Sequence, residues 1–370
     1  MKTVRRLLYH DILSSVLFVA LAFLSLFFFI DFVDELGGLG DNGRGVAQVV
    51  LAALFELPGH FYELFPIAVL IGTIYSLSRL AQSSEFTILR TSGLGPGRAL
   101  GLLAALGLLF GAATFVIGDY VAPTSERQGV LLKARSSDGL RIEGAGGWLK
   151  GKRSTAEGET SYTVNINGAT AGGVLAGIRI FEFDADGRLA TRIEAVQGRV
   201  DTGGTWTLID AGVARWPKAR AAGTPQVLLS QEKTLVWQST LTAEVVAAAV
   251  LPLGTMTTAE LWRYSEHLNV QEQATQRYEI LFWKKALYPL ACLVMMALAL
   301  PFAYLHARAG SVSFKVFGGI MLGIGFVLLN NLAGHVGLLR GWTPWVAAAT
   351  PSLLFLLLSL AAFTWLVRYR

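Results

Sequence analysis

Six apolar stretches, each long enough to cross a lipid bilayer, constrain the fold of this chain more than any other feature of its sequence. A helix of roughly 20 apolar residues covers ~30 Å of hydrocarbon. We therefore expect membrane-spanning helices at residues 12–33, 49–78, 99–121, 280–305, 314–338 and 344–367. The composition agrees, because 53% of the 370 residues are hydrophobic and only 15% are charged. The sequence predicts a polytopic α-helical membrane protein, with three spans on each side of a long insertion.

Basic residues near the ends of these spans are concentrated on one side of the predicted membrane. The residues on that side are Lys2, Arg5, Arg6, Arg79, Arg90, Arg98, Arg308, Lys315, Arg368 and Arg370. The short loops of the other side contribute only Arg44 and Arg340. Because cytoplasmic loops carry the excess of Lys and Arg, we expect both termini to be cytoplasmic and the insertion to be periplasmic. The net charge of +5 is explained by basic loops that face anionic lipid headgroups, and it requires no nucleic acid.

The insertion contains short runs typical of β-strands, separated by turn signals. These runs cover residues 162–166, 177–183, 205–209, 226–230 and 234–238, and the segment 184–187 is typical of a hairpin turn. Many short strands without a helical period indicate an all-β sandwich or a jelly-roll-like domain, although the sequence does not give the strand order.

A capping box follows the predicted strands, since Thr257 stands three residues before Glu260. It predicts an amphipathic helix that buries Leu261, Tyr264 and Leu268 and leads into the fourth span. The expected parts of the chain are 1–122 with the first three spans, 123–256 with the β domain, 257–278 with the connecting helix, and 279–370 with the last three spans.

A polar segment at residues 77–93 separates the second and third spans. As a helix it would be amphipathic, because Leu80 and Ile88 are apolar while Glu85 is charged. A short amphipathic helix between two spans is how a permease receives force from a partner outside the membrane. An ordinary solvated loop is an equally good interpretation of these residues alone.

No catalytic or metal-binding motif is evident in the sequence. Residues 146–153 are close to a phosphate-binding loop, but Arg153 stands where that loop needs Ser or Thr. The five histidines are scattered and form no recognised ligand motif. Cys292 lies within an apolar span, where packing explains it better than nucleophilic chemistry. We therefore expect a protein that is not an enzyme and that holds no cofactor and no metal.

Three intramembrane or interfacial features each allow two interpretations. Gly319 and Gly323 place small residues on one helix face, for packing within this chain or against a partner subunit. Asp31 and Asp34 close the first span, where they are either simply solvated or functional. A basic cluster of Arg127, Lys133 and Arg135 follows the third span and is either a solvated linker or a site for anionic groups.

The chain resembles the LptF/LptG family of lipopolysaccharide export permeases, and its LptG branch more closely than its LptF branch. The residues that carry this resemblance are Phe32–Asp34, Leu57–Pro58, Phe65–Ala68, Leu80–Glu85, Ile117–Pro123, Arg277–Tyr278, Trp283 and Pro289–Leu290. The resemblance covers both membrane halves and the order of the parts, while the β domain matches mainly in position and kind.

The resemblance implies an assembly in the inner membrane of a Gram-negative bacterium. This chain would pair with an LptF-like permease, and an LptB-like ATPase dimer would bind ATP and drive both. An LptC-like protein would add a single span and a β jelly roll, and an LptA-like bridge would receive lipopolysaccharide in the periplasm. The segment around 80–92 would be the coupling helix, with Glu85 docking on the ATPase and Ser84, Phe86 and Arg90 beside it.

The resemblance also implies candidate residues for binding the lipid. Acyl chains would contact Phe28, Phe65, Phe317 and Phe326, and phosphates would contact Lys133 and Lys285 near the outer mouth, where Asp31 and Asp34 also lie. One position departs from the LptG branch, which often has a phosphate-binding lysine where this chain has Asp31. Recognition of charge must then come from elsewhere, such as Arg44, Lys133, Lys285 or the partner permease, or the lipid itself carries less phosphate or carries cationic groups.

Two other functions remain open on the sequence alone. One is the permease of another lipid or lipoprotein exporter. The other is a membrane-anchored scaffold whose β domain binds a partner, and in a scaffold a substitution of Glu85 would have no effect.

Overall fold

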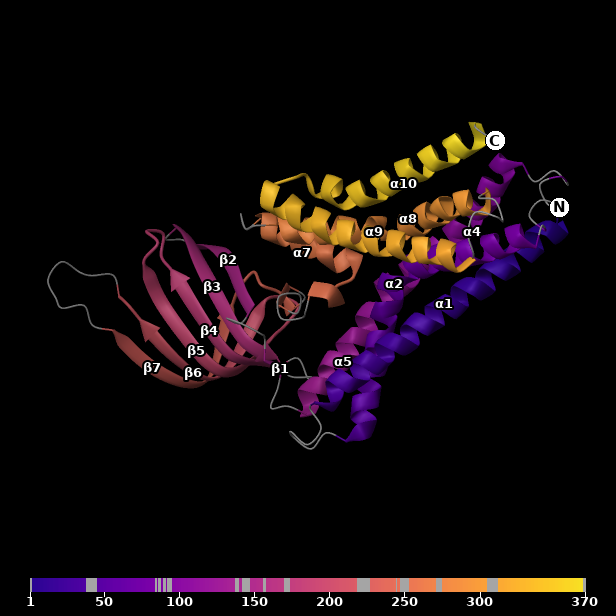
Figure 1. The fold of residues 1–370 in the computed structure, drawn as a ribbon. Helices are drawn as coiled ribbons and strands as arrows, with labels where there is room; N and C mark the ends of the chain where they lie inside the picture. The colour runs from indigo at the N-terminus through magenta and orange to yellow at the C-terminus, as the bar shows by residue number, and fades with distance from the viewer. Residues whose placement is uncertain are drawn as a thin grey trace. The chain divides into compact units, whose positions relative to one another are not determined.

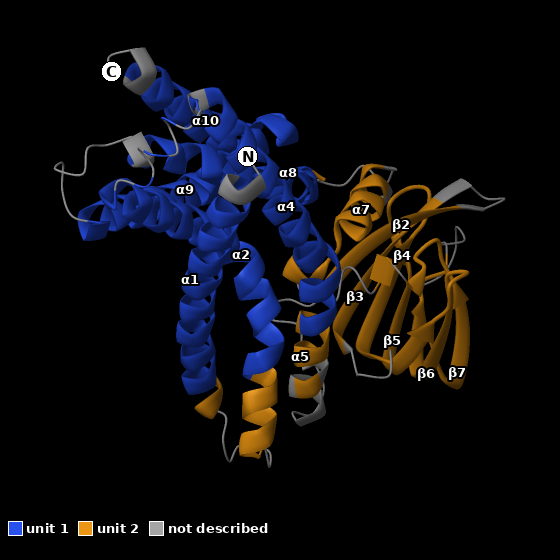
Figure 2. Ribbon diagram, turned by 90° about the vertical axis from the view of Figure 1, so that its right-hand side faces the viewer, with its two compact units in different colours: residues 1–34, 53–125, 276–370 blue, residues 35–52, 126–275 orange. Residues whose placement is uncertain are grey.

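The computed structural model describes residues 2–37, 45–83, 85, 88, 91, 95–136, 140–141, 147–155, 158–169, 174–217, 227–243, 245–246, 253–270, 275–304 and 312–368. The chain forms two compact units (Figure 2). Unit 1 comprises Met1–Asp34, Ala53–Ser125 and Gln276–Arg370, and unit 2 comprises Glu35–Ala52 and Glu126–Thr275. Long apolar helices dominate unit 1, and an antiparallel sheet dominates unit 2.

Among the described residues, six helices are long and apolar enough to cross a membrane, which agrees with the predicted number of spans. They form around α1 (Lys2–Leu36), α2 (Val46–Gln82), α4 (Pro96–Val116), α8 (Gln276–Tyr304), α9 (Val312–Arg340) and α10 (Pro344–Arg368) (Figure 1). The third apolar helix does not end where its apolar run ends. It continues through a π-helical turn (Ile117–Val121) into α5 (Ala122–Ser136). The boundary expected at residue 122 therefore lies inside a helix, because a loss of apolar residues marks the edge of the hydrocarbon rather than the end of backbone hydrogen bonding.

The core of unit 1 forms around the middle of α2. The side chains from Phe65 to Ile74 are all buried, and Phe65 packs edge-on against Phe110 of α4 with the ring centroids 5.5 Å apart. Thr73 of α2 donates a 3.0 Å hydrogen bond to Met296 Sδ of α8, which gives this buried hydroxyl a partner. The first half of α2, with Pro58, is less buried than this central part.

Helices α1 and α9 approach α2 closely at glycines. A methyl group on Gly72 would lie 2.6 Å from Val16 Cα, so α1 and α2 cross in direct backbone contact there. A methyl group on Gly319 or Gly323 of α9 would lie 2.7 Å from the Ile74 or Ile67 side chain of α2. Of the two interpretations of the Gly319 and Gly323 stripe, the structure shows packing within this chain.

The β domain of unit 2 is one antiparallel sheet, which confirms an inserted all-β domain. Its described strands are β1 (Leu140–Arg141), β2 (Gly147–Thr155), β3 (Gly158–Ala169), β4 (Leu175–Phe183), β5 (Leu189–Val200), β6 (Thr205–Arg215) and β7 (Leu228–Gln238). Strands β3 to β7 pair in chain order, and β1 and β2 both pair with β3 (Figure 1). Within the described residues the strand order is therefore that of a meander.

The predicted runs do mark strands, but they cover only some of the strands that the structure describes. Residues 228–230 and 234–238 of the last two runs lie in the single strand β7, and β1, β2 and β5 were not predicted. The hairpin turn at Asp184 is confirmed, since Asp184 Oδ1 accepts hydrogen bonds from the backbone of Asp186 and Arg188, and Gly187 has a φ of +76°. Residues 147–153 of the near phosphate-binding loop are part of β2, and a strand leaves no loop there to hold a phosphate.

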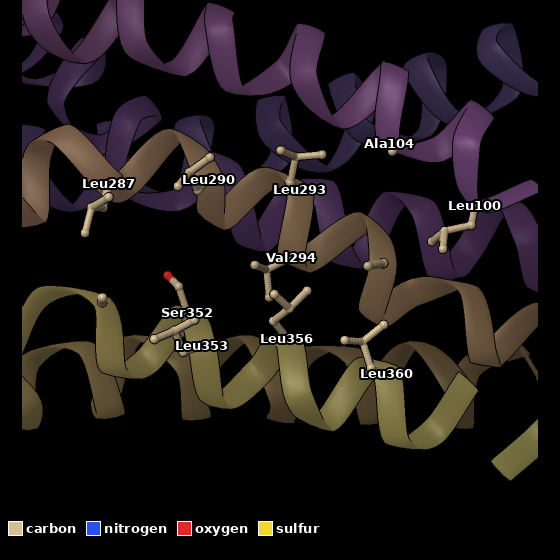
Figure 3. A pocket seen from close by; sticks show the side chains of 12 residues that line it. Leu100, Ala104, Leu287, Leu290, Leu293, Val294, Ser352, Leu353, Leu356 and Leu360 are labelled. Atoms are coloured by element: carbon tan, nitrogen blue, oxygen red, sulfur yellow. The ribbon is translucent and has the colours of Figure 1, made fainter. Parts of the chain in front are cut away.

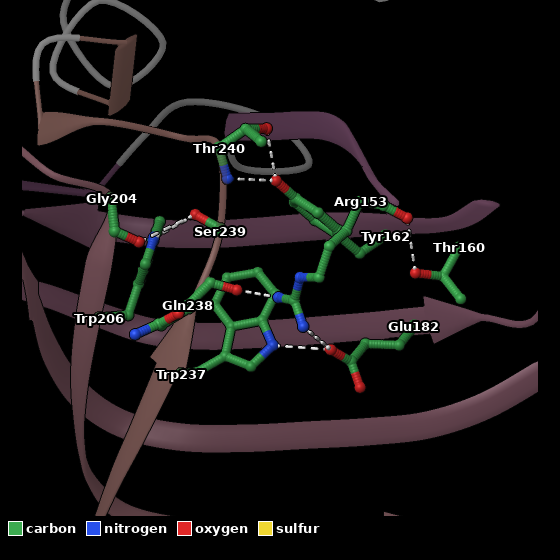
Figure 4. A network of polar contacts seen from close by, with 10 residues as sticks. All are labelled: Arg153, Thr160, Tyr162, Glu182, Gly204, Trp206, Trp237, Gln238, Ser239 and Thr240. Atoms are coloured by element: carbon green, nitrogen blue, oxygen red, sulfur yellow. Dashed lines mark hydrogen bonds and ion pairs between the residues drawn. The ribbon is translucent and has the colours of Figure 1, made fainter. Parts of the chain in front are cut away.

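A network of polar contacts surrounds a cluster of aromatic side chains in the sheet core (Figure 4). The Arg153 guanidinium lies 5.6 Å and 5.5 Å from the ring centroids of Tyr162 and Trp237. Trp237 Nε1 donates a 2.7 Å hydrogen bond to Glu182, and the Tyr162 hydroxyl lies 2.7 Å from Thr240 Oγ1. The polar atom of each buried ring thus has a partner, and Arg153 has a structural role that stacking and charge explain.

Helix α7 (Thr258–Val270) begins at the predicted capping box. The Glu260 backbone donates to Thr257 Oγ1 over 3.2 Å, and the Thr257 backbone donates to Glu260 Oε2 over 2.8 Å. Leu261, Tyr264 and Leu268 are buried, as the amphipathic pattern predicted. Arg127 of α5 forms an ion pair with Glu260 and donates to the Thr255 carbonyl over 3.1 Å. Arg127 is therefore held within unit 2 by protein groups.

Candidate functional site

The polar segment after α2 is helical at the residues that the structure describes. Glu85, Ile88 and Thr91 have helical conformation, and Thr91 Oγ1 donates a 2.9 Å hydrogen bond to the Ile88 carbonyl. Because residues three apart share a helix face, Glu85 and Ile88 are neighbours on this surface. Both side chains are exposed, and that of Ile88 is 61% exposed. A carboxylate beside an exposed isoleucine suits contact with another protein. Ser84, Phe86 and Arg90 lie outside the described residues.

The two helices that flank this segment, α2 and α4, are both tied to α1 by side chains. Arg79 in the last turn of α2 donates a 3.0 Å hydrogen bond to Asp11 Oδ2 of α1. Tyr9 of α1 donates a 3.0 Å hydrogen bond to the Leu102 carbonyl of α4. The three helices are therefore linked by side chains at the end of unit 1 where the Glu85 segment begins. A displacement of that segment would reach α1 as well as α2.

The four phenylalanines expected to bind acyl chains occupy different environments. Phe65 and Phe326 are 4% and 2% exposed and form part of the unit 1 core, where Phe326 packs against Phe355 of α10. Phe28 of α1 is half-buried and stacks on Phe32. Phe317 of α9 is 58% exposed. Phe317 is thus the member of the set whose ring is open to an acyl chain, and Phe65 and Phe326 are committed to packing.

The charged residues expected to bind the lipid also lie on different helices and in different environments. Lys133 lies on α5, and its side chain is outside the described part of the chain. Lys285 on α8 is half-buried and has a protein partner, and Asp34 near the end of α1 is exposed. Arg44, another expected source of positive charge, lies outside the described residues.

Asp31 has close partners that the sequence analysis did not assign to it. Asp31 Oδ2 lies 2.9 Å from His60 Nε2 of α2, and Glu56 completes a group of three side chains with ligand atoms within 4.8 Å of one another. Glu56 and His60 are four residues apart, so they share a face of α2. That four-residue spacing was the signal in the sequence that could have identified Glu56 and His60 as neighbours. The contribution of Asp31 from a different helix could be seen only in the fold.

An apolar pocket lies along α8 between α4 and α10 (Figure 3). Its volume is about 500 Å³, and Ser352 is the one polar residue among the twelve that line it. Val294 of α8 faces Leu356 of α10, and Leu293 points toward α4 (Figure 3). Such a lining suits hydrocarbon, because a polar ligand would find almost no hydrogen-bonding groups there.

Comparison with known proteins places the chain within one group. The sequence model of the family described as "Lipopolysaccharide export system permease LptF/LptG" matches residues 6–366. The chain is 27% identical over 354 residues to the lipopolysaccharide export system permease protein LptG of Escherichia coli K12, covering 94% of both chains. It is 24% identical over 359 residues to the protein of the same description from Haemophilus influenzae Rd, covering 96% of both chains.

Proposed function

The chain belongs to the LptF/LptG family of lipopolysaccharide export permeases, and from this premise we propose that it is the LptG-like half of a permease pair driven by a separate ATPase. It is a multi-pass protein of the inner membrane and a permease component of lipopolysaccharide export. The other half of the pair would be an LptF-like chain. An LptC-like protein and an LptA-like bridge would receive the lipid from the two permeases, and the sheet of unit 2 is the part of this chain that resembles those proteins in kind.

The proposed orientation places both termini and the Glu85 segment in the cytoplasm and the β domain in the periplasm. It rests on the ten basic residues on one side of the spans against two on the other. In this orientation the Glu85 segment meets an LptB-like ATPase dimer, which binds and hydrolyses the ATP.

One observation carries the coupling role. Glu85 is exposed and helical, and it follows α2, whose last turn contains Arg79; Arg79 holds α1 through Asp11. A carboxylate can pair with Arg or accept hydrogen bonds from backbone amides of the ATPase as its two subunits close. The resulting pull on the segment would be transmitted to α1 and α2 and would narrow the space available to the lipid between the two permeases.

The test is co-purification of an ATPase with the full-length chain, followed by ATP turnover of the complex in nanodiscs. Glu85→Lys should weaken the association or separate ATP turnover from lipid release. Glu266→Lys is a matched control, because Glu266 is an exposed carboxylate on a helix of unit 2. If no ATPase accompanies the wild-type chain, the coupling role is wrong. If the two variants behave alike, Glu85 is not the coupling residue.

A further inference from the structure

Asp31, Glu56 and His60 form a mixed donor group in unit 1 that the transport scheme above does not use. One ligand atom from each of the three side chains lies within 4.8 Å of the other two. Two donors are carboxylate oxygens and the third is an imidazole nitrogen. This is the combination that Zn²⁺ takes, with ligand distances of about 2.0–2.2 Å. Two ligand atoms of one tetrahedral ion are about 3.3–3.6 Å apart, so the side chains must rotate toward one another to seat it.

The group is held in place by its surroundings. The ring centroid of Phe27 lies 4.8 Å from that of His60, and His60 Nε2 is 2.9 Å from Asp31 Oδ2. The Asp31 and His60 side chains are only 11% and 23% exposed. The imidazole is thus partly buried and oriented, and it lies near two carboxylates, which distinguishes this group from a solvated cluster of acids.

The local charge also favours a cation. Residues 27–63 carry six carboxylates, those of Asp31, Asp34, Glu35, Asp41, Glu56 and Glu63, and one basic side chain, that of Arg44. A proton on His60 would offset only one of these charges. Carboxylates within membrane-spanning helices are costly unless they are compensated, and a divalent cation compensates two at once.

We propose that Asp31, Glu56 and His60 bind one Zn²⁺ ion, and that an anionic oxygen of the transported lipid occupies a coordination position that the protein leaves open. Three protein ligands leave a fourth position of a tetrahedral site free. A phosphate or a carboxylate of the lipid has the chemistry to fill it. The ion would turn a face that repels anions into one that attracts them. This second part rests on the proposed lipid substrate, whereas the binding of Zn²⁺ does not.

The first experiment is a Zn²⁺ titration of the full-length chain with its co-purifying subunits in nanodiscs, after removal of any histidine tag. The wild type should bind one Zn²⁺ per chain against a competing chelator. Asp31→Asn, Glu56→Gln and His60→Gln should each weaken binding at least about tenfold. Glu63→Gln should bind like the wild type, because Glu63 is an exposed carboxylate on the same helix outside the group. Circular dichroism and gel filtration check that each near-isosteric variant folds.

Two results would overturn the site. One is a wild type that binds no Zn²⁺ at micromolar concentration, in which case Asp31 and His60 form an ordinary ion pair between α1 and α2. The other is Zn²⁺ binding that is equally strong in all three variants, which would place the ion elsewhere on the chain.

The second experiment replaces Zn²⁺ with Co²⁺, whose visible absorption reports its ligands. Inorganic phosphate, intact lipopolysaccharide and dephosphorylated lipopolysaccharide are added in separate arms. A spectral change with the intact lipid shows an anionic oxygen at the open position, and its loss on dephosphorylation assigns that oxygen to phosphate rather than carboxylate. No change with any lipid would refute the lipid contact and leave a metal that only joins α1 to α2. A failure of the coupling role would appear in the ATPase co-purification and would leave both metal titrations unchanged.

Discussion

Arg79 and Asp11 are joined by a 3.0 Å hydrogen bond between α2 and α1, one helical turn before the Glu85 segment. The bond links the two helices at the point where the proposed ATPase would act. Arg79 is more than half exposed, so the value of this bond lies in positioning rather than in stability.

Arg79→Gln should therefore reduce coupling with little loss of stability. We expect a change in the free energy of unfolding of about 0.5 kcal/mol, typical of an exposed ion pair. Lipid release per ATP hydrolysed should fall roughly threefold or more, because the pair lies on the route between the two events. The measurement is lipid release and ATP turnover in the same nanodisc preparation. The charge-swapped double variant Asp11→Arg with Arg79→Asp should restore coupling, and a double variant no better than Arg79→Gln would contradict the role of this pair.

Phe326 and Phe317 should respond differently to truncation, although both lie on α9. Phe326→Ala removes a buried ring that packs on Phe355 and should cost about 3–5 kcal/mol of stability. Phe317→Ala removes an exposed ring and should leave the thermal unfolding temperature nearly unchanged. Thermal unfolding followed by intrinsic fluorescence in detergent separates the two. If Phe317→Ala lowers lipid release without altering stability, its ring contacts acyl chains, and equal destabilisation by both variants would contradict the placement of Phe317.

Gly323 and Gly325 offer a matched test of the α2–α9 contact. A methyl group at Gly323 would lie 2.7 Å from Ile67, whereas nothing lies within 4 Å of a methyl group at Gly325. Gly323→Ala should destabilise unit 1 by about 1–3 kcal/mol, and Gly325→Ala should be neutral or slightly stabilising in the helix. Thermal unfolding in nanodiscs is again the measurement. Gly323→Ala with the stability of the wild type would show that the two helices separate readily.

Glu260 should make the start of α7 sensitive to acid. Burial raises the pKa of this carboxyl, but hydrogen bonds from Arg127 and Thr257 outweigh burial and hold the pKa below its usual 4.5. A carboxyl with a lowered folded pKa stabilises the protein above its unfolded pKa, and the stabilisation is lost as pH falls through the folded value. Thr257→Ala, which removes the reciprocal cap, should cost about 1 kcal/mol at pH 7.

The measurement for Glu260 is hydrogen exchange at the first amides of α7, compared between wild type and Glu260→Gln at each pH so that intrinsic rates cancel. The variant should exchange faster at pH 7 and like the wild type well below pH 4.5. Glu266→Gln on the same helix is the control, since its exposed side chain lies away from the cap. A difference between wild type and Glu260→Gln that persists in acid would mean that charge is not its cause.

The sequence predicted the elements that a local pattern encodes. Apolar length located all six spans, the Thr257–Glu260 spacing located the start of α7, and the Asp184–Gly187 run located a hairpin. Strand β5 was missed, although its buried residues Ile193 and Ala195 alternate with charged ones, because Ala, Glu and Gly in this stretch have weak β-propensity. The continuation of the third apolar helix into α5 was missed because helix formation does not require apolar residues.

Contacts between helices could not be predicted in the same way. Asp31 is 29 residues from His60, and Asp11 is 68 residues from Arg79. The sequence around each of these residues gives no indication of its partner on the other helix. Phe65 and Phe326 were candidate lipid contacts for the same reason, because an apolar span does not indicate which of its faces meets protein and which meets lipid.

Because Cys292 is buried, the chain can be labelled at an introduced cysteine for site-directed spectroscopy while the native cysteine stays in place. Its thiol is fully buried against Thr114 in the unit 1 core, and it is the only cysteine of the sequence. A maleimide or spin label would therefore react selectively with one new cysteine introduced at an exposed position such as Ile88 or Phe317. Distances between two such labels would report how the Glu85 segment and α9 move during a transport cycle, without any change to the native core.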